Sequence, residues 1–124
     1  MRIGVPKEIK THEYRVGLVP SSVRELVHHG HEVGVETGAG AGIGCEDWTY
    51  EASGATIVET AQAVWAASDL VVKVKEPQAS EYGFLRQDLT LFTYLHLAAD
   101  APQAAAIMKS GATAIGYETV TDPR

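Results

Sequence analysis

Two lysines close an apolar, β-branched stretch at residues 69–77. If this stretch is a strand, Lys73 and Lys75 share one of its faces, because side chains two residues apart point to the same side. Pro77 ends the element, since proline has no N–H to donate to a neighbouring strand. Lys75 is therefore predicted at the carboxyl end of a strand, where open parallel sheets bind ligands and an ammonium group can meet an anion. A solvated side chain without a role is the commoner outcome for a lone lysine.

Three other chemically capable residues lie beyond predicted strands. Arg15 ends the polar segment 7–15, and its guanidinium group can hold a carboxylate through two parallel hydrogen bonds; alone, it is expected to pair with Glu13 or Glu8. His96 closes the apolar segment 89–95 and has the side chain best suited to proton transfer near neutral pH, although a structural role fits a lone histidine equally well. Glu118 follows the segment 112–117 and is a candidate for orienting an imidazole or a lysine; the alternative is a solvated loop residue.

Taken together, these groups suit a small carboxylate that bears a carbonyl or an amine. The arginine would hold the carboxylate, the lysine would polarise the carbonyl oxygen or bind the carboxylate, and the histidine would move the proton. None of these groups is a redox centre, so an oxidation would require a cofactor.

The pattern of strands and helices explains why such residues should meet. Period-2 and apolar segments predict strands at residues 1–5, 31–37, 55–59, 69–75, 89–95 and 112–117. Helices are expected between them at residues 21–29, 46–53, 60–68, 80–87 and 100–110. Strict alternation indicates an α/β fold with a doubly wound, largely parallel sheet in Rossmann-like or flavodoxin-like layers, as a single domain. The carboxyl ends of parallel strands then share one edge of the sheet.

Local signals place several helix ends. An N-cap is expected at Pro20-Ser21-Ser22, and further caps at Thr60 and Asp100. The helix after Thr60 is expected to face the core with Ala63, Val64 and Ala67. Gly30 and Gly111 are natural helix stops.

Two further motifs are weak evidence for a nucleotide site or a metal site. The glycine-rich segment 38–44 follows a strand, but no register of it reads Gly-x-Gly-x-x-Gly, so a crossing loop is favoured over a dinucleotide fingerprint. His28, His29 and His31 span a predicted helix end, and no ligand set of the zinc type is visible around them. Imidazoles at a helix C-terminus favour its dipole, and this explanation is preferred to a metal site.

Composition narrows the class of protein. The 124 residues suffice for one domain, and the net charge of −6 without a basic cluster argues against nucleic acid and against an anionic membrane surface. The single cysteine, Cys45, fits a reducing compartment. Neither a signal peptide nor an apolar run of membrane-spanning length is evident, so a soluble cytoplasmic protein is expected.

Short motifs across the whole chain resemble the alanine dehydrogenase and pyridine nucleotide transhydrogenase family. They are Gly4-Val5-Pro6-Lys7-Glu8, Glu13-Tyr14-Arg15-Val16, Gly30-His31-Glu32-Val33, Glu36-Thr37-Gly38-Ala39-Gly40, Lys73-Val74-Lys75-Glu76-Pro77, Tyr94-Leu95-His96-Leu97-Ala98-Ala99 and Tyr117-Glu118-Thr119-Val120. Transhydrogenases look different around Lys75 and His96, so the chain resembles the alanine dehydrogenase branch. A small departure is Val19 before Pro20, where the family usually has serine or threonine.

The resemblance implies reversible, NAD-dependent oxidative deamination of L-alanine to pyruvate and ammonium. It further implies that Arg15 and Lys75 bind the substrate and that His96 is the acid and base. Family members run to several hundred residues, form homo-oligomers and carry a separate NAD-binding Rossmann domain with a second catalytic aspartate. Residues 1–124 are therefore expected to form the N-terminal substrate portion, without the NAD-binding domain and without turnover alone. In the family the C-terminal end returns to complete this domain, so exposed apolar sheet surface is expected.

Three alternatives stay open. The first is a non-catalytic or partner-dependent domain that binds a small 2-oxo acid. The second is the N-terminal domain of a transhydrogenase alpha subunit, which the Lys75 and His96 pair opposes. The third is a relative of saccharopine dehydrogenase with a longer substrate.

Overall fold

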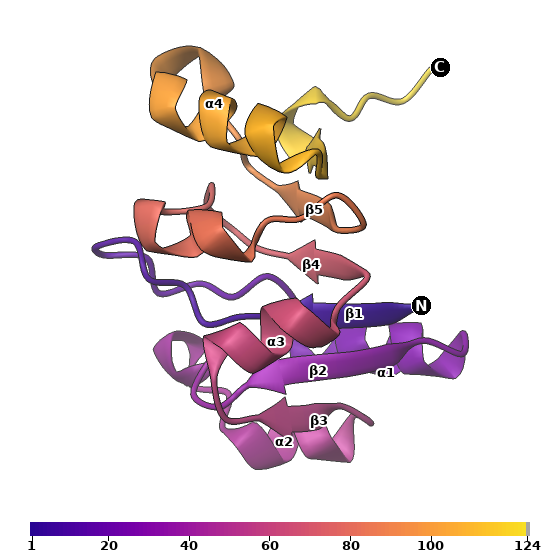
Figure 1. Ribbon diagram of the computed structural model, residues 1–124. Coiled ribbons are helices and arrows are strands. Elements are labelled where there is room, and N and C mark those ends of the chain that lie inside the picture. The colour runs from indigo at the N-terminus through magenta and orange to yellow at the C-terminus, as the bar shows by residue number, and fades with distance from the viewer. Residues whose placement is uncertain (124) are drawn as a thin grey trace.

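The computed structural model describes residues 1–123, which form one sheet of six parallel strands (Figure 1). The strands are β1 (Arg2–Val5), β2 (Glu32–Glu36), β3 (Thr56–Val58), β4 (Leu70–Val72), β5 (Thr90–Thr93) and β6 (Thr113–Gly116). They lie in the order β3-β2-β1-β4-β5-β6. The expected doubly wound α/β fold is thus confirmed, and its strand order is that of the Rossmann fold.

Helices cover both faces of this sheet. Within residues 1–123, the α-helices are α1 (Pro20–His28), α2 (Asp47–Ala52), α3 (Ala61–Ala67) and α4 (Ala101–Ser110). The short 3-10 helices of this part of the chain are η1 (Ala41–Ile43), η2 (Ala79–Phe84), η3 (Leu97–Ala99) and η4 (Tyr117–Thr119). In Figure 1, α3 lies in front of β1 and β2, whereas α1 and α2 lie behind the sheet. No helix within residues 1–123 has the length and apolar character that crossing a membrane requires.

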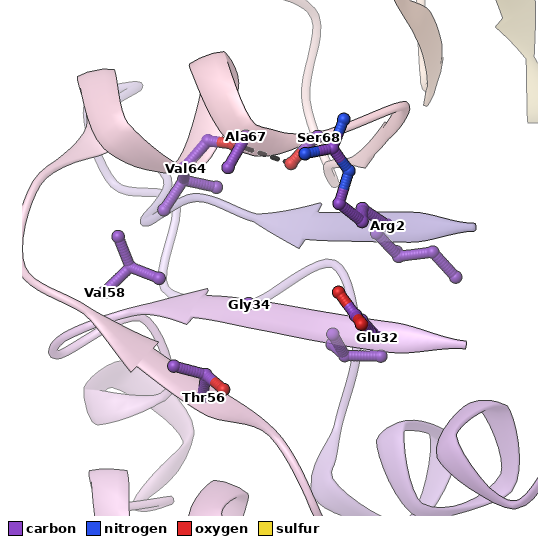
Figure 2. Close-up of a pocket in the computed structure, with 10 residues that line it drawn as sticks. Arg2, Glu32, Gly34, Thr56, Val58, Val64, Ala67 and Ser68 are labelled. Carbon is purple, nitrogen blue, oxygen red and sulfur yellow. Dashed lines mark hydrogen bonds between the residues drawn. The ribbon is translucent and has the colours of Figure 1, made fainter. Parts of the chain in front are cut away.

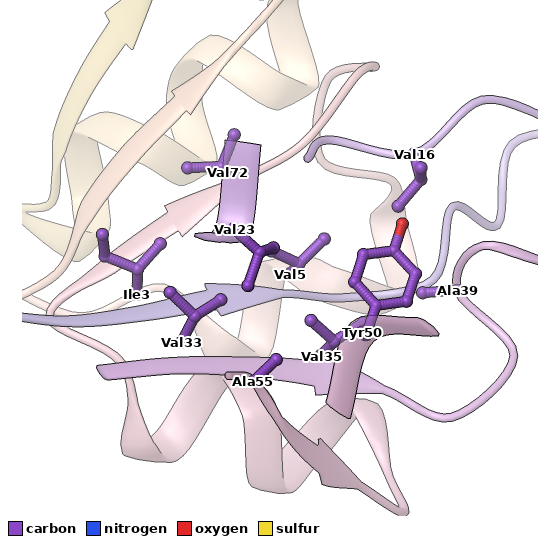
Figure 3. Close-up of a cluster of buried hydrophobic side chains, with 10 residues drawn as sticks. All are labelled: Ile3, Val5, Val16, Val23, Val33, Val35, Ala39, Tyr50, Ala55 and Val72. Carbon is purple, nitrogen blue, oxygen red and sulfur yellow. The ribbon is translucent and has the colours of Figure 1, made fainter. Parts of the chain in front are cut away.

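Alternation along the first two strands builds the core under α1 and α2 (Figure 3). Ile3 and Val5 of β1 pair in register with Val33 and Val35 of β2, and all four side chains are buried. The intervening Gly4 faces α3, where an added Cβ would lie 2.0 Å from the Ser68 Oγ. Because no side chain stands between them, α3 packs directly on β1.

A second core occupies the opposite face. It contains Trp65 of α3, Val71 of β4, Leu91 of β5 and Ile107 of α4. The expectation for α3 was partly wrong: Val64 and Trp65 are buried, whereas the small Ala63 and Ala67 are exposed. The large indole takes the interior position because burying it removes more apolar surface from water.

Helix ends agree largely with the local signals. Thr60 and Asp100 cap α3 and α4 by accepting hydrogen bonds from backbone N–H groups two or three positions into each helix, as expected. The expected cap at residues 20–22 was wrong, because α1 begins after Val19 without a side-chain cap and has Pro20 in its first turn. Proline suits that position, where its missing N–H is not needed.

Strand β4 is shorter than predicted, so both lysines lie beyond its end. Its neighbour β1 ends at Val5 before Pro6, so β4 has a β1 partner only through Val71. Beyond Val72 the chain keeps hydrogen bonds to the β5 side, from the Lys73 N–H to Phe92 and from the Tyr94 N–H to Val74. The prediction that Lys73 and Lys75 share a strand face is therefore wrong, since both follow the strand.

The α1 side of the sheet is covered only in part. Val72, Phe92 and Ile115 form one row across β4, β5 and β6, because they pair in register. Exposure increases along this row, from 8% at Val72 to 42% at Ile115.

Candidate active site

The four candidate residues lie in the segments that follow the carboxyl ends of four neighbouring strands. Arg15 follows β1, Lys75 follows β4, His96 follows β5 and Glu118 follows β6. These strands are consecutive in the sheet, and β1 and β4 flank the point at which the strand order reverses. Ligands of open α/β sheets bind at this crevice. The fold thus brings all four loops to the edge that the sequence indicated.

Arg15 is held by Glu13 rather than by Glu8. Arg15 Nε and Nη2 donate to the two carboxylate oxygens of Glu13 at 2.9 and 2.7 Å. The Arg15 side chain is 65% exposed, whereas that of Glu13 is 6% exposed, so the carboxylate anchors the guanidinium from the protein side. The hydrogen bond from Arg15 lowers the pKa of the Glu13 carboxyl to about 2. Nη1 is outside this contact and can donate to an anion from solvent.

Close backbone contacts place the Arg15 segment. A Cβ added to Gly42 would lie 2.2 Å from the carbonyl oxygen of Tyr14, and one added to Gly17 would lie 2.4 Å from that of Val72. The main chain on either side of Arg15 therefore lies against the glycine-rich segment on one side and the end of β4 on the other. A cavity between residues 7–15 and the glycine-rich segment borders Arg15.

Lys75 and His96 meet at the ring of Tyr94. The Lys75 Nζ lies 5.3 Å from the ring centroid, within the range of a cation–π contact. The imidazole of His96 stacks on the same phenol, with centroids 5.6 Å apart and planes 14° from parallel. The Tyr94 hydroxyl and His96 Nδ1 are 3.0 Å apart. Within residues 1–123, the hydrogen bond of the imidazole engages Nδ1 and not Nε2.

The backbone of His96 is left-handed, with φ 48°, and neighbouring side chains hold it there. The carboxylate of Glu118 accepts hydrogen bonds from the N–H groups of His96 at 2.8 Å and Leu95 at 3.1 Å. The buried Gln103 donates from Nε2 to the Leu95 carbonyl at 2.8 Å. The hydrogen bond from the His96 N–H lowers the pKa of the Glu118 carboxyl. Glu118 therefore contacts the main chain of His96, not its imidazole.

A buried charge cluster contacts the main chain of Lys75 through Glu8, and sequence reasoning missed it. Lys73 is 1% exposed, and its Nζ lies 3.3 Å from Glu8 Oε1 and 3.4 Å from Glu81 Oε2. Burial raises the pKa of the Glu81 carboxyl, against the opposing effect of the Lys73 ammonium. A solvated lysine was the expected alternative for this position, and it is wrong. Glu8 is 65 positions away in the chain, so no local pattern indicates this pairing.

Tyrosines are the other components that sequence reasoning missed. Tyr94 stands two residues before His96, and the two rings stack although both residues follow β5. Tyr117 packs edge-on against Phe92, with ring centroids 5.5 Å apart, and its hydroxyl donates to the Val74 carbonyl. Burial raises the pKa of the Tyr117 phenol. The Tyr117 ring also lies 6.3 Å from the Tyr94 ring, over which the Lys75 ammonium lies.

The weak motifs do not form competing sites. His28 and His29 are exposed at the end of α1, where His29 contacts Glu25 at 3.1 Å. Within residues 1–123, no group of three or more histidine, cysteine or carboxylate side chains is arranged to hold a metal ion. At Gly40 an added Cβ would lie 2.5 Å from the Cys45 carbonyl, so this glycine packs closely on protein.

Another cavity opens at the opposite edge of the sheet (Figure 2). Arg2, Glu32 and Thr56, which begin β1, β2 and β3, lie along it, and Val64 and Ala67 of α3 form its other wall. Arg2 is paired with Asp69, its Nη2 lying 3.4 Å from Oδ1. This hollow lies at the amino ends of the strands, away from the four loops.

Fold and site together define a Rossmann-like α/β domain that carries Arg15, Lys75 and His96 beside its topological switch point. The family model described as alanine dehydrogenase/PNT, N-terminal domain, matches residues 4–124. The chain belongs to this family.

Relatives support the assignment. The chain is 53% identical over 124 residues to alanine dehydrogenase of Bacillus subtilis, covering 100% of this chain and 32% of the relative. It is 52% identical over 123 residues to alanine dehydrogenase of Halomonas elongata, covering 99% and 33%. The chain therefore spans about a third of the length of these relatives.

Solved structures agree with the sequence comparison. A structure of L-alanine dehydrogenase superposes with a TM-score of 0.96 at 54% identity, covering 99% of this chain and 34% of that one. A transhydrogenase from Sinorhizobium meliloti superposes with a TM-score of 0.89 at 27% identity, covering 98% and 37%. The fold is shared with both, and the sequence is closer to the dehydrogenase.

Proposed function

We propose that these 124 residues form the substrate-binding part of an alanine dehydrogenase, which interconverts L-alanine with pyruvate and ammonium using NAD. Family membership and identities above 50% to alanine dehydrogenases support the reaction. The observation that carries the substrate class is the meeting of Lys75 and His96 at the Tyr94 ring, on the sheet edge that also bears Arg15.

Each residue has a role that its position allows. The Arg15 guanidinium, anchored by Glu13 and exposed, binds the substrate carboxylate. The Lys75 ammonium lies against the face of an aromatic ring and donates to the carbonyl oxygen of pyruvate or to its carboxylate. His96, with Nδ1 engaged by Tyr94, exchanges a proton with the substrate through Nε2. Glu118 orients His96 through its main chain.

The cofactor is proposed to bind mainly outside these 124 residues. The glycine-rich segment 38–44 does not fit a dinucleotide, because the positions above Gly40 and Gly42 are filled by Cys45, Tyr50 and Tyr14. We therefore assign residues 1–124 to the substrate domain. A cytoplasmic, homo-oligomeric protein is part of the same proposal.

Titration with pyruvate, followed by NMR, tests the substrate site. Wild type is expected to show saturable shifts around Lys75 and His96, and both Lys75→Ala and Arg15→Ala should abolish them. Lys109→Ala on α4 and Arg24→Ala on α1 remove the same charges from exposed helix positions and should leave binding intact. A folded wild-type chain without shifts, or equal losses in the control variants, would contradict the proposal.

Formation of NADH measures whether these 124 residues catalyse the reaction. We expect no NADH from L-alanine and NAD with these 124 residues alone, because the cofactor is proposed to bind mainly outside them. NADH formation by this fragment would show that it binds the cofactor itself.

The similarity to a transhydrogenase supports one alternative, the N-terminal domain of a transhydrogenase alpha subunit. Pyruvate binding that depends on Lys75 and His96 favours the dehydrogenase. The transhydrogenase reading predicts no pyruvate binding at these residues.

A further inference from the structure

The carboxylate of Glu8 lies beside the main chain of Val74 and Lys75, where no neighbouring strand continues. Strand β1 ends at Val5 and strand β4 ends at Val72. On the side where β1 would have continued, the N–H groups of residues 74 and 75 therefore have no strand as a partner. The Glu8 carboxylate takes them instead: Oε2 accepts from the Val74 N–H at 3.2 Å and Oε1 from the Lys75 N–H at 3.0 Å. A side chain thus supplies the acceptors that a strand would have offered.

The other side of the same segment is held from β5. The Thr93 hydroxyl donates to the Lys75 carbonyl at 2.8 Å, and the Tyr94 N–H donates to the Val74 carbonyl at 3.3 Å. Lys75 therefore has its N–H fixed by Glu8 and its carbonyl fixed by Thr93. Only its side-chain torsions remain free, and the ammonium reaches the Tyr94 ring.

Burial makes this anchor rigid. The side chains of Glu8 and Lys73 are 2% and 1% exposed, and the Lys73 ammonium lies 3.3 Å from Glu8 Oε1. A buried carboxylate needs a cation and hydrogen-bond donors, and Glu8 has both. The same ammonium reaches Glu81, so the cluster also fastens residues 73–75 to η2.

We propose that Glu8 is a positioning residue for substrate binding: its buried carboxylate fixes the main chain of Val74 and Lys75 and so sets the Lys75 ammonium beside Tyr94. The inference rests on the proposed function, because Lys75 is its substrate-binding group. Glu8 acts through the backbone and touches no substrate. Its segment also leads into Arg15, so one carboxylate ties together the loops that carry both cations.

Glu81 provides a matched control. Both glutamates contact Lys73 Nζ, but only Glu8 also accepts from the Val74 and Lys75 N–H groups. Glu81→Gln therefore perturbs the same buried ion cluster without removing the backbone anchor. A role of Glu8 in stability or charge alone predicts equal effects from the two glutamates.

The experiment combines amide hydrogen exchange with pyruvate titration of wild type, Glu8→Ala, Glu8→Gln and Glu81→Gln. In wild type, the Val74 and Lys75 amides should exchange on the order of 100-fold more slowly than in an unfolded peptide. Glu8→Ala should lose this protection at both amides. Glu8→Gln, which keeps one oxygen acceptor, should lose it chiefly at Val74. Pyruvate Kd should rise about tenfold or more in Glu8→Ala, because a displaced Lys75 ammonium would lose its charge-assisted hydrogen bond to the substrate.

The outcomes separate the two proposals. Fast exchange at Val74 and Lys75 in wild type overturns the anchor without any variant, so the test holds even if Glu8→Ala does not fold. Unchanged pyruvate affinity in folded Glu8→Ala, or an equal loss in Glu81→Gln, overturns the positioning role while the substrate site stands. Slow exchange without pyruvate binding in wild type shows instead that the proposed function, and with it the role toward substrate, is wrong.

Discussion

The ammonium of Lys75 lies 5.3 Å from the centre of the Tyr94 ring. The same ring stacks on His96 and places its hydroxyl 3.0 Å from Nδ1. One phenol therefore contacts both the cation and the proton-transfer group of the proposed site. Its face and its hydroxyl serve different partners, so substitution can separate their effects.

Tyr94→Phe should remove the contact of the hydroxyl with His96 Nδ1 and keep the contact of the ring face with Lys75. The phenyl ring keeps the face that the ammonium contacts, while the hydroxyl opposite Nδ1 is lost. We expect a changed ¹⁵N signal of His96 Nδ1 with almost unchanged pyruvate affinity. Tyr94→Ala should in addition weaken pyruvate binding by about two- to fivefold, the size of an exposed cation–π contact. Equal affinity losses in the two variants would mean that the hydroxyl, not the ring face, supports Lys75.

Glu13→Gln should lower stability at neutral pH and have no effect in strong acid. The pKa of the Glu13 carboxyl, about 2 in the folded chain, lies below its unfolded value near 4.3, so its stabilisation is complete above the unfolded value and is lost as the pH falls toward 2. We expect the melting temperature to fall by about 1–4 °C at pH 7, with a smaller difference at pH 3. Glu51→Gln, at an exposed position of α2, is the control. A difference that stays constant with pH would contradict the ion pair.

Gly42→Ala should disturb the Arg15 segment. The added methyl group would lie 2.2 Å from the Tyr14 carbonyl oxygen, so the backbone next to Arg15 must move. Overpacking of this kind destabilises by about 1–3 kcal/mol, and we expect weaker pyruvate binding along with it. Chemical denaturation and titration measure the two effects. Gly83→Ala is the matched control, because a Cβ at Gly83 would meet no atom of the described residues within 4 Å. Equal effects from the two alanines would rule out the close contact as the cause.

Glu118→Ala should loosen the turn at His96. The N–H groups of Leu95 and His96 lose their acceptor, and the left-handed conformation of His96, with φ 48°, loses its main support. Faster exchange of the His96 amide and greater imidazole mobility in NMR relaxation are expected. Because the folded pKa of Glu118 is lowered, acidification of wild type through that pKa should release the same turn. Glu59→Ala, at an exposed position, should change neither observable.

Much of this protein followed from local sequence rules. Apolar alternation predicted each strand of the sheet, and cap residues such as Thr60 and Asp100 predicted where helices begin. Parallel strands share a carboxyl edge, so the positions of Lys75 and His96 after apolar segments sufficed to place them on it. Each of these inferences spans only a few residues, which is the range over which backbone periodicity acts.

Only the tertiary structure decided which of these residues touch. The strand order makes β1 and β4 neighbours and so brings the loops of Arg15 and Lys75 together. Lys73 is buried because Glu8, 65 positions away in the chain, lies against it. A charge enters the interior only when a partner offsets its loss of water, and the fold alone selects that partner. Periodicity predicts the face or strand end at which a side chain lies; long-range packing determines its neighbours.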